Sequence, residues 1–352
     1  MEAVFSCAIL TMSYSLSSAD GARNLKSTRS EGYDWSIMKG HFVFLARILA
    51  ASLLTGCMVA RTDCVDSDGS CDLFTAFLLY QTIPALYIAS SGTNSIVRIR
   101  DMDGSGLTIF SPGTGTLNLP QGVASDSSGR LYAASANTDS VIRMNDLAGS
   151  GLVTYNPGIG TLDSPDGLAV DSSGRVYICA ANLDALLRID DMSGAGLATY
   201  SPGAGTLANP QGVVLDGSGR IYVASFDTNS VIRINDMAGS GLAIYNPGVG
   251  TLNSPQGVAL DSLGRLYIAS EMTDSVIRID DMTGAQLTVY TPGPATLDGP
   301  RGVAVDRYNR IYISSFVTNT VLRIDDMTGA GLRIYNPGTA TLSGPQYLSF
   351  GP

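Results

Sequence analysis

The sequence predicts an all-β protein: a six-bladed β-propeller of 45-residue, four-stranded repeats, closed by the C-terminal strand. Six tyrosines recur every 45 residues without insertion or deletion, and a long consensus recurs with them. They are Tyr87, Tyr132, Tyr177, Tyr222, Tyr267 and Tyr312. A repeat of roughly 40 to 50 residues that holds several short apolar runs is typical of one propeller blade.

Each repeat contains four segments of strand length, as the copy from Pro255 to Gly299 shows. They are rich in β-branched and aromatic residues and comprise Val258–Leu260, Leu266–Ala269, Val276–Ile279 and Leu287–Tyr290. Between the first two lies Asp261–Gly264, the composition of a tight hairpin turn. Asn309 replaces the turn glycine once, and asparagine also tolerates the positive φ that such turns need. The nearly continuous apolar strands indicate blades that neighbouring blades bury on both faces.

The two ends of the repeat array predict a closed ring. The array begins in the middle of a repeat at Ala85 and ends after the first strand of another, Pro345–Phe350. We expect this last segment to supply the inner strand that the first blade lacks, because closure removes two open sheet edges and a linear array gains nothing from it. The apolar run Leu73–Tyr80 is the alternative for that strand, although it lacks the Pro-x-Gly opening.

The repeat resembles the NHL repeat of six-bladed propellers. The resemblance covers residues 85–352 and rests on P-x-G-V-A-x-D-x-x-G-R-[LIV]-Y-[IV]-A, as at Pro210–Ala224 and Pro255–Ala269. It implies a propeller that binds proteins, RNA or small molecules, as most such propellers do, whereas a minority are lyases or lactonases. A fold of this kind leaves the function open.

The segment before the repeats resembles a bacterial lipoprotein signal. Met38 and a basic residue precede the apolar stretch Ile48–Leu54, and Leu54-Thr55-Gly56-Cys57 matches the lipobox, whose cysteine is acylated. The resemblance implies a signal peptide at 38–56, a lipid-anchored linker at 57–84, and a cell-envelope location facing the periplasm or the exterior. We expect residues 1–37 to be an untranslated upstream segment. A transmembrane helix at 42–60 is disfavoured by Arg47 and by the short uninterrupted apolar length.

The residues after Cys57 are acidic and lack lysine, histidine and tryptophan. Their 16 arginines stand against 26 aspartates and one glutamate, a net charge of −11. These absences exclude a Schiff-base lysine, Ser-His-Asp and Cys-His pairs, histidine-ligated zinc, and the chemistry of propeller lyases that use histidine. Nucleic acid is disfavoured as a partner because six of the arginines occupy one fixed repeat position and form no basic face.

Cys64 and Cys71 are predicted to form a disulfide. An exported protein and a short intervening loop favour the bond, and no further soft metal ligand lies nearby. The run Asp66–Gly69 resembles part of an EF-hand loop, but Cys64 would hold its first position and Thr75 its last, so we reject a calcium loop there.

Residues common to all repeats are expected to serve packing and turns. We expect the Asp261 and Arg278 series to form a repeated ion pair or arginine-to-backbone contacts. The Asp281 series is expected in tight turns with Asx hydrogen bonds. The alternative for adjacent aspartates is a calcium site at Asp190–Asp191, Asp280–Asp281 and Asp325–Asp326.

The residue after each blade-opening proline is expected at the mouth of the central channel. Around the ring this position holds Gln346, Gln121, Asp166, Gln211, Gln256 and Arg301. Asp166 and Arg301 are three blades apart and therefore opposed across the ring. The set predicts a site for a polar or zwitterionic ligand, or alternatively for water.

A second variable position follows the second strand, on the same face. It holds Ser91, Ala136, Ala181, Phe226, Glu271 and Phe316, and the next position adds Asp227, Met272 and Val317 in blades four to six. Aromatic and apolar residues beside charges predict a binding surface for a protein, peptide or glycan. In the alternative, the two phenylalanines fill gaps between blades and Glu271 pairs with Arg301.

The favoured function is therefore a non-catalytic binding module without a cofactor. The alternative is an enzyme resembling metal-dependent gluconolactonases, because Pro165–Asp171 matches their P-D-G motif. That resemblance implies that Asp166 coordinates calcium or another divalent cation, with Glu271, Asn137 and Asn182 as imperfect stand-ins for the other ligands. A purely structural envelope protein is the third hypothesis.

Overall fold

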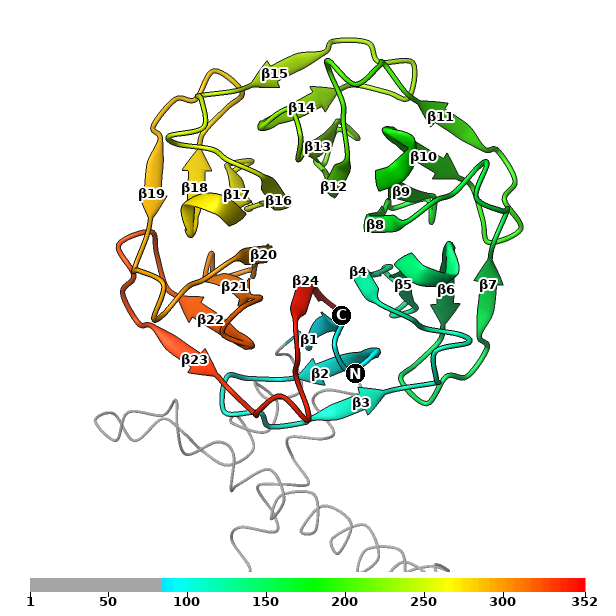
Figure 1. Cartoon of the computed structure of the whole chain (residues 1–352), viewed down its shortest axis with the longest axis horizontal. Helices are drawn as coiled ribbons and strands as arrows, with labels where there is room; N and C mark the ends of the chain where they lie inside the picture. The colour runs from blue at the N-terminus through cyan, green and yellow to red at the C-terminus, as the bar shows by residue number, and fades with distance from the viewer. Residues whose placement is uncertain (1–83, 352) are drawn as a thin grey trace, which may run out of the picture. The chain divides into compact units, whose positions relative to one another are not determined.

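The structure, a computed structural model, describes residues 84–351, which form a six-bladed β-propeller (Figure 1). Every blade is a four-stranded antiparallel sheet whose first strand lines the centre of the ring. The predicted fold class is confirmed. Among the described residues, no helix has the length and apolar character to cross a membrane.

The blades are numbered here from 1 to 6 along the chain, with strands given from the centre outward. Blade 1 holds β24 (Pro345–Phe350), β1 (Leu86–Ser90), β2 (Ser95–Ile99) and β3 (Thr108–Phe110); blade 2 holds β4 (Pro120–Ser125), β5 (Leu131–Ser135), β6 (Ser140–Met144) and β7 (Val153–Tyr155); blade 3 holds β8 (Pro165–Val170), β9 (Val176–Ala180), β10 (Ala185–Ile189) and β11 (Ala198–Tyr200). Blade 4 holds β12 (Pro210–Leu215), β13 (Ile221–Ser225), β14 (Ser230–Ile234) and β15 (Ala243–Tyr245); blade 5 holds β16 (Pro255–Leu260), β17 (Leu266–Ser270), β18 (Ser275–Ile279) and β19 (Thr288–Tyr290); blade 6 holds β20 (Pro300–Val305), β21 (Ile311–Ser315), β22 (Thr320–Ile324) and β23 (Arg333–Tyr335). Short 3-10 turns follow three of the second strands: η2 (Ala136–Thr138), η3 (Ala181–Leu183) and η4 (Glu271–Thr273).

The C-terminal strand closes the ring, as predicted. β24 pairs antiparallel with β1, with Phe350 opposite Leu86 and Leu348 opposite Ile88. Phe350 also packs edge-on against Tyr312 of blade 6, with ring centroids 5.0 Å apart. The inner-strand position of blade 1 is therefore filled by β24, and the alternative segment 73–80 lies outside the described residues.

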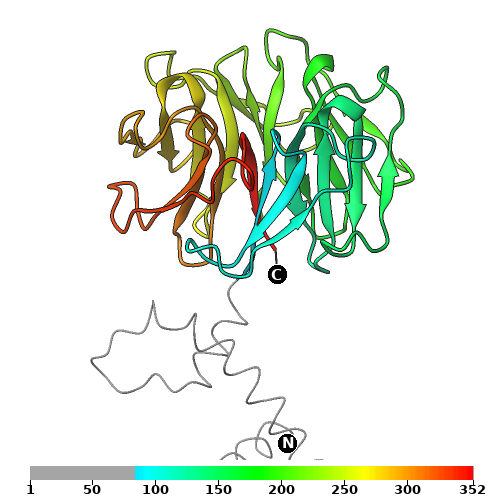
Figure 2. The same ribbon diagram turned by 60° about the horizontal axis from the view of Figure 1, so that its bottom comes forward.

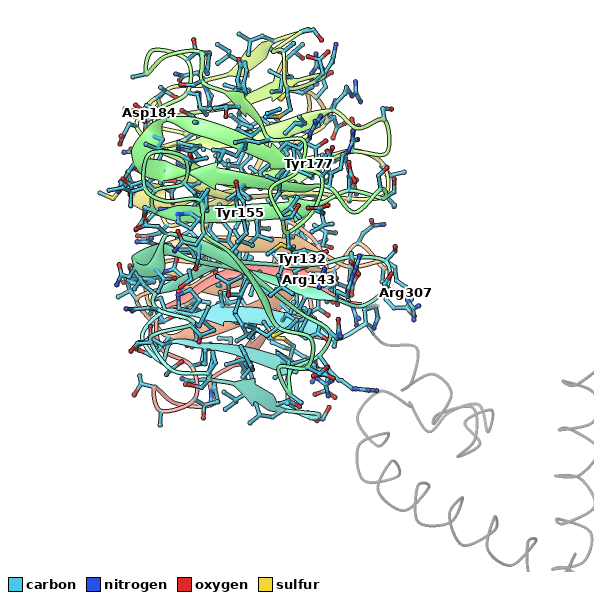
Figure 3. The ribbon with its side chains drawn as sticks, turned by 90° about the vertical axis from the view of Figure 1, so that its right-hand side faces the viewer. Tyr132, Arg143, Tyr155, Tyr177, Asp184 and Arg307 are labelled. Atoms are coloured by element: carbon cyan, nitrogen blue, oxygen red, sulfur yellow. The ribbon has the colours of Figure 1, made fainter. Side chains whose placement is uncertain are left out.

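The two faces of the ring differ in what they carry. β1 begins and β24 ends on one side, where the Gly351 N–H donates to the Ala85 carbonyl at 2.9 Å (Figure 2). We call this side the terminal face. The inner strands begin on the opposite side, which we call the mouth face. Figure 3 shows the ring edge-on, with Asp184 at the mouth face and Arg307 at the terminal face.

The hairpin turns of the terminal face are held by an aspartate–arginine pair. In blade 5, Asp261 Oδ1 accepts the backbone N–H groups of Leu263 and Arg265, and Oδ2 accepts from Arg265 Nε at 2.6 Å and from the Tyr267 hydroxyl at 3.2 Å. Burial raises the pKa of Asp261, but these donors outweigh it and lower the pKa overall. The recurring tyrosine thus covers the turn that precedes it.

Of the two expectations for the Asp261 and Arg278 series, the ion pair between them is wrong, whereas arginine-to-backbone contacts occur in three blades. Asp261 pairs with Arg265, four residues away in the same turn, because the turn brings their side chains together. Arg278 instead donates to Thr288 Oγ1 at 3.2 Å, and its equivalents in blades 1, 3 and 4 donate to backbone carbonyls of outer-loop glycines. The Asp281 series lies in turns as expected: its Oδ1 accepts the Thr283 N–H at 2.8 Å.

One hydrogen bond links each blade to the next at the mouth face. Asn229 ends the connection between the second and third strands of blade 4 with φ of 51°, and its Oδ1 accepts the Ser254 N–H at 2.7 Å. Ser254 directly precedes the proline that opens β16. The same link occurs around the whole ring, at Asn94–Leu119, Asp139–Ser164, Asp184–Asn209, Asn229–Ser254, Asp274–Gly299 and Asn319–Gly344.

Deletion of residues 345–352 should destabilise the whole propeller. Blade 1 would lose its inner strand and leave two sheet edges open. Truncating one buried leucine to alanine lowers the free energy of unfolding by about 2–5 kcal/mol. Loss of the whole strand with Tyr347, Leu348 and Phe350 should therefore lower it by at least that much. Urea unfolding of the truncated and full chains measures the difference. Coincident unfolding midpoints would contradict closure by β24.

Candidate functional site: the channel mouth

The inner strands place both variable positions at the mouth face. The strand-opening residue Gln256 lies beside the end of β17, because Pro255 pairs with Ser270. The Glu271 N–H then donates to the Ser254 carbonyl at 3.2 Å, and Phe226 and Phe316 make the same backbone contact in their blades. The structure therefore brings the two predicted columns together at one face, as expected from the sequence.

The inner strands approach one another so closely that their third residue is glycine in five blades. These are Gly122, Gly167, Gly212, Gly257 and Gly302. A Cβ atom added to Gly302 would lie 2.6 Å from the Gln346 carbonyl oxygen, and the other four meet their neighbours as closely. Blade 1 has Tyr347 at this position. Comparing all six copies at this position would have found it, but the sequence analysis did not single it out.

Tyr347 spans the mouth of the channel. Its side chain is buried, and its hydroxyl donates to Gln256 Oε1 of blade 5 at 3.3 Å and lies close to the carboxyl group of Asp166 in blade 3. It therefore reaches residues two blades away in both directions. Burial raises the Tyr347 pKa well above its ordinary value, and Asp166 adds to the rise. The phenol is a neutral plug at the centre of the mouth.

A charged network occupies the mouth of blades 5 and 6. Glu271 Oε1 accepts from the Arg301 guanidinium at 2.7 Å, and Glu271 Oε2 accepts from Gln256 Nε2. The guanidinium carbon of Arg301 lies 4.4 Å from the centre of the Phe316 ring. Phe316 also lies against the loop at Gly344 that leads into β24. For Glu271 and Phe316 the structure shows the alternative contacts: an ion pair and packing between blades.

The exposed part of the variable surface is aliphatic and acidic. Met272 is 66% exposed and Val317 56%, and Asp227 is also exposed, whereas Phe226 is half-buried. At the positions equivalent to Asp227, Met272 and Val317, blades 1 to 3 carry Gly92, Asn137 and Asn182, which are exposed but have no apolar side chain. Exposed apolar side chains at this face are therefore confined, among these positions, to the later blades.

Asp166 is a buried carboxyl group that faces mixed charges. It is 7% exposed, and burial raises its pKa to about 7. The nearby Tyr347 hydroxyl, the positive charge of Arg301 and the Gly167 N–H oppose the rise, and Glu271 adds to it. Its Oδ1 has no hydrogen-bond partner among the described residues. Near neutral pH this group exchanges between charged and neutral forms.

A separate cavity of about 290 Å³ lies in the channel on the terminal side of Tyr347. It is lined by the last three residues of each inner strand, which are mostly valine, leucine and alanine. Two hydroxyl groups line it, and both donate to the Phe350 carbonyl, Ser125 at 2.9 Å and Ser349 at 3.5 Å. No charged side chain lines this part of the channel.

The residues at the mouth do not fit a divalent cation. Hard cations take about six to eight oxygen ligands, several of them carboxylate. Both oxygens of Glu271 are engaged, and the stand-in Asn182 donates to Asp163 Oδ1 at 2.8 Å on the loop surface. Within residues 84–351 no three histidine, cysteine, aspartate or glutamate side chains are grouped to hold a metal. We therefore derive no metal-assisted hydrolysis at Asp166.

The predicted lipidation site Cys57 and the predicted disulfide Cys64–Cys71 lie outside the described residues. Cys179, in β9, is buried and unpaired. Burial, followed by the nearby Asp166, raises the pKa of its thiol well above the ordinary value. It is therefore a packing residue of blade 3 and no nucleophile.

No protein-family model and no curated protein matches the sequence. Among solved structures, the chain is similar to virginiamycin B lyase from Staphylococcus aureus, with a TM-score of 0.50 and 21% identity over 65% of this chain and 73% of that one. It is similar to a chain of the nidogen/laminin complex, with a TM-score of 0.62 and 19% identity over 76% and 98%. It is also similar to a protein of unknown function from Bacteroides caccae, with a TM-score of 0.58 and 14% identity over 76% of this chain and 99% of that one. Identities this low show the shared propeller fold alone.

Replacing Asp166 with asparagine should change how stability depends on pH. The folded-state pKa of about 7 lies above the ordinary value, so the folded protein holds a proton that the unfolded chain has lost between about pH 4 and 7. The Asp166 contribution is therefore full at low pH and is lost as the pH rises to 7. Relative to the wild type, the free energy of unfolding of Asp166→Asn should therefore rise by about 1.4 kcal/mol for each pH unit between about pH 4 and 7.

Urea unfolding of both proteins at pH 5, 6, 7 and 8 measures this difference. It should increase up to about pH 7 and then level off, because both states are ionised above that pH. The paired aspartates of the terminal face have lowered pKa values and are common to both proteins, so their effect cancels. A difference that does not change with pH would contradict the buried, raised-pKa carboxyl group.

Proposed function

We propose that this chain is an NHL-like propeller that is anchored to the cell envelope by a lipid on Cys57 and captures a partner protein or peptide on its mouth face. The observation that carries the proposal is the one-sided exposure of Met272 and Val317 on the adjacent blades 5 and 6. Exposed apolar side chains surrounded by polar residues are typical of protein-binding surfaces. The supporting sequence features are the NHL-like consensus and the lipobox.

The composition of the surface favours a protein or peptide over a glycan. Glycans stack on exposed aromatic rings, whereas Phe316 lies beneath the Arg301 guanidinium and Phe226 is half-buried. The side chains that reach solvent are a methionine and a valine beside Asp227. Methionine adapts to varied apolar partners. We therefore expect the partner to present an apolar segment that carries positive charge.

The place where the chain enters the propeller agrees with tethering. The first described residues lie on the terminal face, so a tether that ends at residue 84 leaves the mouth face on the opposite side of the ring. The similar nidogen structure was solved as a complex with laminin, so a propeller of this fold occurs in a protein complex there. The lyase likeness does not extend to histidine chemistry, because residues 84–351 contain no histidine.

The double variant Met272→Asp and Val317→Asp should lose partner capture by at least tenfold. The charges would face the apolar segment of the partner, and neither side chain is buried, so thermal stability should change little. The test is quantitative pull-down from an envelope extract with the immobilised protein. Leu263→Asp is the matched control, because Leu263 is 73% exposed on the terminal face. Equal losses in both variants, or none in the double variant, would contradict a mouth-face site.

Cys57→Ser should abolish membrane association and leave the propeller folded. The attachment depends on acylation, and a thiol is required for it, whereas no residue of the propeller contributes. The measurement is membrane fractionation after a high-salt wash, with circular dichroism as the control for folding. A Cys57→Ser protein that stays in the membrane pellet would contradict lipid anchoring.

A further inference from the structure

Three side-chain oxygens at the channel mouth have no hydrogen-bond partner among the described residues. They are Gln346 Oε1, Gln121 Oε1 and Asp166 Oδ1. They belong to the same position of three consecutive inner strands, in blades 1, 2 and 3. Gln346 is 2% exposed and Asp166 7%, and Gln121 is half-buried at the rim. Buried polar groups without a partner are costly, so a donor at this position would stabilise the mouth.

The orientation of the Gln346 amide follows from its neighbours. Ser91 Oγ donates its proton to the Gly344 carbonyl at 2.8 Å and can therefore only accept from Gln346, whose Nε2 lies 3.1 Å away. The amide oxygen of Gln346 must then be the free end. Asp166 offers acceptor oxygens whenever it is ionised. The unpaired atom of Gln346 is thus an acceptor by necessity, and that of Asp166 is one in the ionised form.

The remaining side chains of the ring already have partners. Gln211 Nε2 donates to Asn209 Oδ1 at 2.6 Å in its own loop, and Gln256 bridges Tyr347 and Glu271. Arg301 has an unpartnered Nε, but its guanidinium is neutralised by Glu271 and stacked on Phe316. Open acceptors therefore gather in blades 1 to 3, next to the one carboxyl group of the ring that has no cationic partner.

We propose that this half of the mouth binds a primary ammonium group that the partner of the proposed function presents, from a lysine side chain or an N-terminus. An ammonium group has three N–H donors and one positive charge, which match three acceptors and one carboxyl group. A lysine carries its ammonium group on a narrow apolar stem. A planar guanidinium would need paired acceptors in one plane, and a divalent cation would need more carboxylates.

The inference rests on the proposed function for the identity of the partner, but the site can be tested without one. Titration of the purified full chain with n-butylammonium chloride, followed by calorimetry and by NMR of backbone amides, should show saturable millimolar binding. Amide signals of Gln121, Asp166 and Gln346 should shift. Signals of the terminal-face turns, such as Leu263, should not.

Asp166→Asn and Gln346→Met should each weaken n-butylammonium binding at least tenfold. The matched control is Asp163→Asn, which removes the same charge from the same blade at a surface residue that contacts Asn182. It should leave the affinity unchanged. Equal weakening by Asp163→Asn would show a non-specific charge effect and would overturn the site. Absence of saturation when the added salt is 100-fold less concentrated than the n-butylammonium ligand would overturn it as well. Thermal melts of each variant confirm that it is folded.

Three further ligands separate the sources of the binding group. N-acetyl-lysine amide represents a lysine side chain, alanine amide an N-terminus, and potassium chloride a bare cation. Binding of either amine supports the proposal and identifies the source, whereas displacement of n-butylammonium by equimolar potassium would overturn it in favour of an ion site. Loss of partner capture in Met272→Asp with Val317→Asp, combined with intact amine binding, separates the two proposals. If amine binding fails and capture persists, this inference alone is wrong.

Discussion

One hydrogen bond organises the ring: an Asn or Asp side chain of each blade accepts the backbone N–H of the residue before the next proline. Asn229 and Ser254 form it between blades 4 and 5, and Asn319 and Gly344 form it between blades 6 and 1. It holds the start of each inner strand at one height relative to the blade before it. Since it also joins the last blade to the first, closure uses the same geometry as every other junction. The channel mouth inherits its regular register from this link.

Regularity at the mouth gives each departure from the consensus a defined place. The glycine layer brings inner strands so close that a single Tyr347 crosses the channel and contacts two other blades. Its hydroxyl lies between Asp166 and Gln256, and Gln256 continues to Glu271 and Arg301. The side chains of four blades are therefore coupled through one phenol.

The sequence was sufficient for the fold because period, turn residues and array ends each follow from local composition. It was also sufficient to place Gln256 and Glu271 at the same face of the ring, because their position depends on strand pairing alone. It failed where a side chain could choose among partners at similar spacing: Asp261 bonds Arg265 rather than Arg278 because a hairpin turn folds back on itself. Tyr347 is visible in the sequence as the one departure from glycine at its position, but its burial in the channel depends on how closely the other five inner strands approach.

Asp166 stabilises the folded ring less than the glutamine found at its position in other blades, and this argues for a role in binding. Four other blades place glutamine at its position, and an amide is neutral at every pH. A carboxyl group held at a pKa of about 7 by burial costs stability once it ionises. Perturbed groups of this kind gather at functional sites more often than at structural ones. The unpaired Oδ1 and the neighbouring unpaired amide oxygens at the same strand position supply the complementary observation.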